Sequence, residues 1–279
     1  MKRLAVSRIR ERLGLSERKA CLLVNLSTSV YRYQPKPGND EQLRKRLREL
    51  AEQRKRFGSP RLHILLKREG LVVNHKKTER LYREEGLALR KKRKRKGAAG
   101  ARVVIPFPKK TNERWSMDFV TDSIVTGRRF RALTIVDDYT RECPAIEVDT
   151  SLGGRRVVSV LDRLAEIRGL PEVITIDNGP EFSGRALDEW AYRKGVKLNF
   201  IRPGKPIENA YIESFNGRFR DECLNTNWFI SLKHARALIE EWRKDYNEVR
   251  PHSSLKGFTP KEYAVMTAKT LMQGELITG

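Results

Sequence analysis

The sequence predicts an α/β fold, with a sheet of mixed direction in the carboxyl-terminal part of the chain and a helical, strongly basic region before it. From about residue 112, short apolar strands alternate with amphipathic helices, a pattern typical of a sheet covered by helices. Residues 1–100 contain helices, turns and positive charge instead. At 279 residues the chain exceeds the usual size of one domain, so we expect one core and one or two smaller modules.

The positive charge is concentrated at the front of the chain. Residues 1–100 hold 30 Lys and Arg against 10 Asp and Glu, whereas residues 101–279 hold 28 against 25. A bias of this size over a hundred residues indicates a polyanionic partner, and DNA or RNA is favoured because binding releases counterions. Few aromatic anchors accompany the basic segments, which argues against a membrane surface. No stretch approaches the roughly 18 apolar residues of a membrane span, so we expect a soluble, cytoplasmic protein.

Cysteine and histidine usage indicates no metal module. Cys21, Cys143 and Cys223 are widely separated, and none of the four histidines has a cysteine at ligand spacing. We interpret the cysteines as buried or idle thiols.

The first residues predict a possible small helix-turn-helix over residues 1–35. Residues 16–33 read as two short helices that break at Asn25-Leu26-Ser27, where Ser27 can cap the second helix.

A second helix-turn-helix is predicted over residues 40–90. A charged helix over 40–57 precedes two helices that are separated by Gly70, and Asn74 can cap the last of them. Base-contacting residues usually lie early in the second helix of such a pair. The candidates there are His75, Lys76, Lys77, Thr78 and Arg80.

A basic linker is predicted over residues 91–111. Its charges suit contact with phosphates without sequence reading, and Gly97-Ala98-Ala99-Gly100 follows them as a hinge. The candidate DNA-contacting residues of the linker are Lys91, Lys92, Arg93, Lys94, Arg95 and Lys96.

The catalytic part is predicted over residues 112–279, with further helices at its end. Three strands are followed by helix, strand, helix, strand and helix, which predicts a mixed sheet. The predicted strands cover 114–120, 129–136, 144–148, 173–176 and 197–201, and the predicted helices cover 155–168, 184–194, 208–222 and 231–247.

Three acidic residues fall at strategic points of this pattern. Asp118 lies in the first strand, Asp177 ends the fourth, and Glu213 is in the middle of a helix. Functional groups gather at strand ends in open α/β sheets, so these carboxylates can converge. Each is weak evidence alone, since Asp177 begins an ordinary turn sequence and a helical glutamate is usually a solvated surface group.

The helix around Glu213 has a more specific pattern. At 100° per residue, an apolar stripe runs beside a polar stripe that contains Glu213, while Ser214, Arg218 and Asp221 are expected to face solvent. A carboxylate flanked by amides and an arginine suits metal and phosphate contact. The polar stripe consists of Asn209, Glu213, Asn216 and Arg220.

Four motifs together carry a resemblance to a known family. They are W-S-M-D-F at 115–119, I-D-N-G-P-E-F at 176–182, R-P-G-K-P-I-E-N-A-Y-I-E-S-F-N-G at 202–217 and Y-N-E-V-R-P-H-S-S-L at 246–255. From about Trp115 to Tyr263 the chain resembles the integrase-type catalytic core of bacterial insertion-sequence transposases, in the retroviral integrase superfamily with its RNase H-like fold. The 35 residues between Asp177 and Glu213 match the spacing in that group, and Ile176 stands where a serine is common.

The resemblance assigns roles to particular residues. It implies that Asp118, Asp177 and Glu213 are catalytic and bind two Mg²⁺ or Mn²⁺ ions, and that Arg220 contacts DNA. Asn209, Asn216 and Lys205 are further candidate DNA contacts beside them.

The resemblance also extends over the front of the chain. This part is similar to transposases encoded by the second of two overlapping reading frames, in which a first-frame protein or frameshift fusion supplies a further helix-turn-helix and a leucine zipper. No sustained heptad run is found here, and the zinc-binding module of retroviral integrases is absent.

These features predict a DDE transposase that cleaves transposon ends and transfers the freed 3′-hydroxyl to target DNA. The expected partners are the terminal inverted repeats, target DNA and further copies of the chain in a homo-oligomer, with nucleoid association when bound to DNA. Two alternatives stay open: an RNase H-like nuclease or retroelement integrase, and a DNA-binding inhibitor of transposition with a silent core.

Overall fold

The computed structural model describes residues 2–33, 40–89, 106–179, 181–182, 184–202 and 209–275. The chain divides into two compact units, Met1–Lys45 and Arg46–Gly279. No helix of the described residues is long and apolar enough to cross a membrane.

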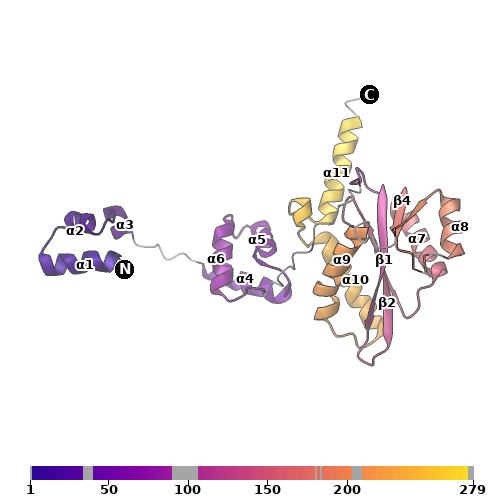
Figure 1. Ribbon diagram of the computed structural model, residues 1–279, viewed down its shortest axis with the longest axis horizontal. Helices are drawn as coiled ribbons and strands as arrows, with labels where there is room; N and C mark the ends of the chain where they lie inside the picture. The colour runs from indigo at the N-terminus through magenta and orange to yellow at the C-terminus, as the bar shows by residue number, and fades with distance from the viewer. Residues whose placement is uncertain are drawn as a thin grey trace. The chain divides into compact units, whose positions relative to one another are not determined.

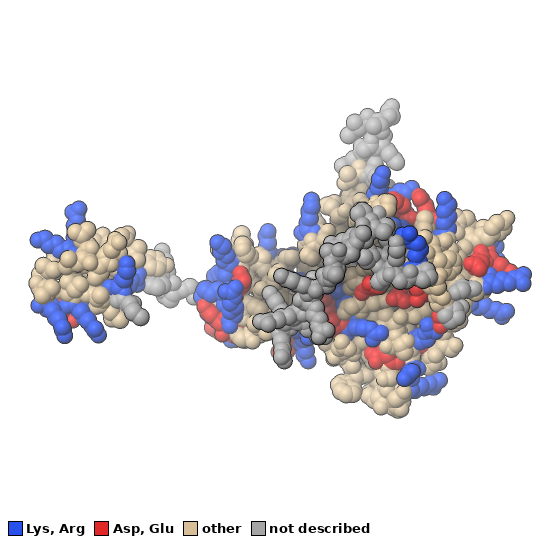
Figure 2. All heavy atoms as spheres, in the orientation of Figure 1, with Lys and Arg blue, Asp and Glu red and all other residues tan. Residues whose placement is uncertain are grey.

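The first unit contains three short helices, α1 (Lys2–Leu13), α2 (Glu17–Leu23) and α3 (Thr28–Arg32). Its small core consists of Val6, Ala20 and Cys21. The hydroxyl of Ser27 accepts a hydrogen bond from the Val30 amide at 3.2 Å, so the predicted cap is confirmed. Figure 2 shows that Lys and Arg outnumber Asp and Glu on the face of this unit that is in view.

Three further helices follow, α4 (Glu41–Gln53), α5 (Ser59–Arg68) and α6 (His75–Glu84). The Asn74 side chain accepts from the Lys76 amide at 2.9 Å, which caps α6 as predicted. His75, Lys76 and Arg80 are exposed on this helix. Thr78 is buried and its hydroxyl lies 2.9 Å from Nδ1 of His63, so the interpretation of Thr78 as a base-contacting candidate is wrong.

A five-stranded sheet forms the centre of the second unit, with β1 (Arg114–Ser123), β2 (Arg129–Asp137), β3 (Ala145–Asp149), β4 (Val173–Ile176) and β5 (Lys197–Phe200). The strand order is β3-β2-β1-β4-β5. β1, β2 and β3 pair antiparallel, whereas β4 and β5 run parallel to β1. The predicted mixed sheet is therefore confirmed. β1 is longer than predicted because its pairing with β2 continues to Ser123 and Arg129.

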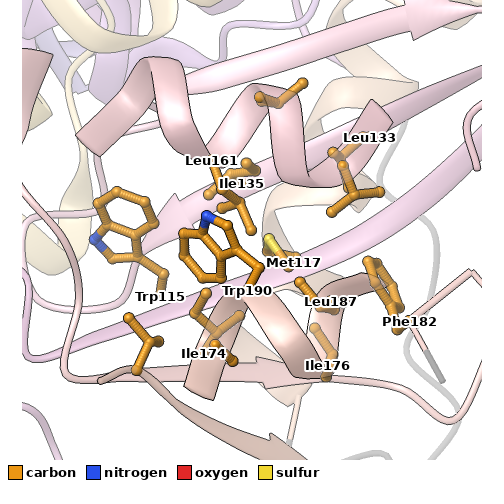
Figure 3. Packing of buried hydrophobic residues seen from close by; sticks show 14 of the residues in the cluster. Trp115, Met117, Leu133, Ile135, Leu161, Ile174, Ile176, Phe182, Leu187 and Trp190 are labelled. Carbon is orange, nitrogen blue, oxygen red and sulfur yellow. The ribbon is translucent and has the colours of Figure 1, made fainter. Parts of the chain in front are cut away.

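Helices cover both faces of the sheet (Figure 1). α7 (Gly154–Arg168) and α8 (Arg185–Lys194) lie on one face, and α9 (Ala210–Glu222) and α10 (Leu232–Glu248) lie on the other. Figure 3 shows the core under α7 and α8, where Trp115 and Trp190 pack with Met117 and Ile174. The two cores hold the sheet between layers, so residues at its strand ends have fixed positions. The chain continues into α11 (Pro260–Glu275).

The α5 helix packs against the carboxyl end of α9 within the second unit. The Glu222 carboxylate pairs with Arg61 at 2.9 Å and with Arg250 at 2.6 Å. Arg250 is 2% exposed, and Arg61 lies over the ring of Phe57 at 5.1 Å. Gly257 leaves the space that Ile64 fills, because a Cβ at Gly257 would lie 3.2 Å from its Cδ1.

Candidate active site

The pairing of β1 with β4 brings two predicted catalytic aspartates together. Ser116 pairs with Thr175 in this parallel ladder, so Asp118 and Asp177, each two residues further on, lie side by side beyond the end of the pairing. Neighbouring strands are about 4.8 Å apart. Side chains alternate between faces, and Trp115 and Ile174 point into the core under α7 and α8. Asp118 and Asp177 therefore belong to the opposite face, which α9 covers.

The third carboxylate comes from α9. Asn216 of α9 is buried and donates from Nδ2 to Oδ2 of Asp118 at 2.8 Å. Glu213 is exposed and lies three residues earlier, on the same side of the helix, because residues three apart are neighbours on a helix surface. The contact between Asn216 and Asp118 thus sets the position of Glu213 along the sheet.

A polar network fixes the orientation of Asp118. Oδ1 of Asn216 accepts from the Thr134 hydroxyl at 2.9 Å, and that hydroxyl is also 3.0 Å from the carbonyl oxygen of Asp118. The amide of Phe119 donates to Oδ1 of Asp118 at 2.7 Å. Both carboxylate oxygens of Asp118 are thereby oriented before any ligand binds.

The acidic neighbours of Asp118 influence its pKa. Burial raises the pKa of Asp118, and the charges of Asp177 and Glu213 raise it further, against the lowering effect of the hydrogen bonds from Phe119 and Asn216. Carboxylates that destabilise one another in this way gain from a nearby cation. The arrangement therefore favours binding of positive charge.

Hard oxygen donors of this kind fit a divalent cation such as Mg²⁺, which is commonly held by a few carboxylates plus water and phosphate. No group of three or more His, Cys, Asp or Glu side chains among the described residues lies close enough together to hold a metal ion as it stands. Glu213 is exposed, so its side chain is free to move toward the two aspartates.

Three family models match the chain. An integrase core domain matches residues 108–206, a second integrase core domain matches 194–260, and an HTH-like domain matches 38–95. A protein of insertion element IS407 of Burkholderia multivorans is 54% identical over 260 residues, which cover 93% of this chain and 94% of that protein. The chain belongs to the insertion-sequence transposases with an integrase-type core.

Other relatives of the transposase come from further bacteria. A protein of insertion element IS476 of Xanthomonas euvesicatoria is 48% identical, over 94% of this chain and 76% of that protein. The putative transposase InsK of IS150 from Escherichia coli is 29% identical, over 83% and 86%. Among solved structures, the catalytic core of HTLV-2 integrase in complex with magnesium has 17% identity and a TM-score of 0.45, over 56% of this chain and 97% of that chain.

The other predicted site residues of the transposase differ in exposure, and some lie outside the described residues. Arg220 is exposed near β1, with Nη1 3.5 Å from the carbonyl oxygen of Thr121. Asn209 is buried, and its Oδ1 has no partner among the described residues. Lys205 and the linker residues 91–96 lie outside the described residues, so their DNA contacts stay predictions.

The predicted solvent face of α9 is confirmed only in part. Ser214 is exposed, and the side chain of Asp221 is 44% exposed although it forms an ion pair with Arg56. Arg218 is half-buried, so the prediction is wrong there. The helical period gave the correct angles, but a periodicity argument within one helix cannot show that a distant segment covers that face.

The role of Asn216 was missed in part. The sequence placed it beside Glu213 as a DNA contact, whereas in the transposase its side chain is occupied by Asp118 and Thr134. The signal available was its position three residues after Glu213, at the border of the apolar stripe, where a buried amide needs partners inside the protein.

Proposed function

We propose that the transposase cleaves DNA at transposon ends and joins the freed 3′-hydroxyl to target DNA in a reaction that depends on divalent cations. In the first step a water oxygen bonds to phosphorus and the P–O3′ bond breaks. In the second step the freed 3′-oxygen bonds to a target phosphorus and expels the 3′-oxygen of the target strand. Neither step requires a covalent protein intermediate.

One observation carries this proposal. Asp118 and Asp177 lie at adjacent positions of the central strands, and Asn216 ties the helix of Glu213 to Asp118. Bound Mg²⁺ or Mn²⁺, two ions per site, would stabilise the attacking and leaving oxygens of an in-line displacement. Asp118, Asp177 and Glu213 would hold these ions, and all three would act in the ionised form.

The thiols of Cys143 and Cys223 have no part in the proposed chemistry. Cys143 and Cys223 are buried, and burial raises the pKa of each thiol to about 12. Neither thiol forms a thiolate at neutral pH, so neither can act as nucleophile.

The proposed partners are the terminal inverted repeats and target DNA. The exposed His75, Lys76 and Arg80 of α6 support sequence reading by the helix-turn-helix. We further propose that the transposase acts as a homo-oligomer on paired ends, with a first-frame protein or frameshift fusion as an additional component.

A strand-cleavage assay on labelled candidate ends tests the proposal. With Mg²⁺ or Mn²⁺ the full chain should nick the strand at the element boundary and then form joined products. A metal chelator should abolish both products, and excess Mg²⁺ should restore them. Cleavage that persists in the chelator would refute the dependence on divalent cations.

A further inference from the structure

A fourth carboxylate lies beside Asp177. Glu181 follows it in the loop after β4, and Gly179 lies between them. A Cβ built on Gly179 would meet Oδ1 of Asp177 at 2.9 Å and Oε2 of Glu181 at 3.2 Å. The two carboxylates therefore flank the same side of Gly179, and only glycine leaves both in place. The Gly179 amide also donates to Oδ1 of Asp177 at 3.0 Å.

The other oxygen of Glu181 pairs with Arg131 of β2. The guanidinium carbon of Arg131 lies 4.3 Å from the ring centroid of Phe119, the residue after Asp118. Phe119 in turn stacks on Phe182 at 4.9 Å between centroids. Arg131 thus packs on the residue after Asp118 and pairs with the carboxylate of Glu181.

This pair differs from an ordinary surface ion pair of the same domain. The side chains of Arg131 and Glu181 are 30% and 21% exposed, whereas those of Arg185 and Glu189 in α8 are 91% and 62% exposed. Charges that are shielded from water interact more strongly with their surroundings.

We propose that Glu181 is a further cation-positioning carboxylate of the active site. Its ion pair with Arg131 determines how strongly the negative charge of Glu181 attracts a cation there. The inference rests on the proposed divalent-cation chemistry. Mg²⁺ usually keeps several waters, and a carboxylate close to a ligand assists a hydrated cation by charge and hydrogen bonding without being a ligand itself. Glu181 is placed for that role by Gly179, beside Asp177.

Direct Mn²⁺ titration of the full chain, followed by electron paramagnetic resonance without DNA, tests the inference. Glu181→Gln should raise the Kd for Mn²⁺ about tenfold, the lower end of the loss found for residues that support metal ligands. Arg131→Gln should lower the Kd several-fold, because Glu181 then keeps its charge without a counter-ion. Glu181→Asp should recover part of the affinity.

The opposite signs separate this role from a purely structural one. If the pair only fastened the loop, both substitutions would break the same contact and weaken Mn²⁺ binding alike, which would overturn the inference. Glu189→Gln and Arg185→Gln are the matched controls, and neither should change the Kd. Urea unfolding of each variant checks that the fold is retained.

Failure of the inference is distinguishable from failure of the proposed function. If Glu181→Gln binds Mn²⁺ like the wild type while Asp177→Asn does not bind it, only the inference fails. If the wild-type chain binds no Mn²⁺ and cleaves no DNA, both fail.

Discussion

At the scale of single residues, substitutions of the three carboxylates should abolish catalysis without weakening DNA binding. Asp118→Asn, Asp177→Asn and Glu213→Gln each keep the shape of the side chain but remove a negative charge on which the proposed cation binding depends. We expect each to abolish cleavage and strand transfer, while DNA affinity in a mobility-shift assay changes less than twofold. Near-normal turnover with Mg²⁺ by any one of them would contradict its assignment as a metal ligand.

Arg220 should affect cleavage after DNA has bound. It lies about two turns beyond Glu213 on α9 and is exposed, which places its guanidinium within reach of a phosphate near the carboxylates. Arg220→Ala should lower cleavage of bound ends about tenfold with an unchanged unfolding midpoint.

Arg193 in α8 is the control for Arg220, because it is exposed on the opposite face of the sheet. Arg218, on the same helix as Arg220, is half-buried and would mix stability with activity. Equal defects in Arg193→Ala and Arg220→Ala would show that only general charge matters.

The carboxylates and their strands were predictable from the sequence, whereas the contacts that orient them were not. Strand and helix periods are local properties, so they located Asp118, Asp177 and Glu213 correctly on β1, after β4 and in α9. The bond from Asn216 to Asp118 joins residues far apart in sequence. Such partners depend on the packing of α9 against the sheet, which no local pattern encodes.

At the scale of elements, the carboxyl end of α9 depends on a buried ion pair. Removal of one partner leaves a buried charge unpaired, which typically costs about 3–5 kcal/mol. Glu222→Gln should therefore lower the free energy of unfolding by about 3 kcal/mol in urea, because Arg250 loses its carboxylate.

Glu248→Gln is the matched control for Glu222→Gln. Its carboxylate pairs with Lys261, and both side chains are more than half exposed, so the loss should stay below about 1 kcal/mol. Similar losses in the two variants would argue against an important role for burial at Glu222.

The segment after α10 should make stability depend on pH. Burial lowers the pKa of His252 to about 2, and the charges of Arg250, Arg218 and Arg61 lower it further. The unfolded chain takes up a proton near the ordinary pKa of about 6.5 while the folded chain does not, so stability is full above that pH and is lost as pH falls.

Urea unfolding at pH 7.5 and pH 5.5 measures this loss. His252 should contribute a loss of about 1.4 kcal/mol for each pH unit below 6.5, and His252→Gln should remove that part of the wild-type slope. A slope that is unchanged in the variant would exclude His252 as its source.

At the scale of the whole molecule, the uneven charge should govern how DNA affinity responds to salt. Each neutralised phosphate contributes about −0.9 to the slope of log K against log salt. Replacing all six basic residues of 91–96 with Gln should reduce the slope by up to about 5. Replacing Lys197, Lys233 and Lys269 with Gln should change the slope by less than about 1. These three lysines are exposed on the surface of the integrase-type core domain. An unchanged slope in the first variant would show that the basic run does not contact phosphates.

Exchange of the helix-turn-helix region between related insertion elements is constrained by the contacts of α5 with the end of α9. A donor helix-turn-helix that lacks the equivalents of Phe57, Arg61 and Ile64 would leave Glu222 with one counter-ion fewer and an empty space above Gly257. Chimaeras designed to redirect such an enzyme to new end sequences should therefore change the exposed residues of α6 and retain the α4–α5 connection of the recipient. The exposed surface of α6 can then diversify while the contacts of α5 with Glu222 and Gly257 stay unchanged.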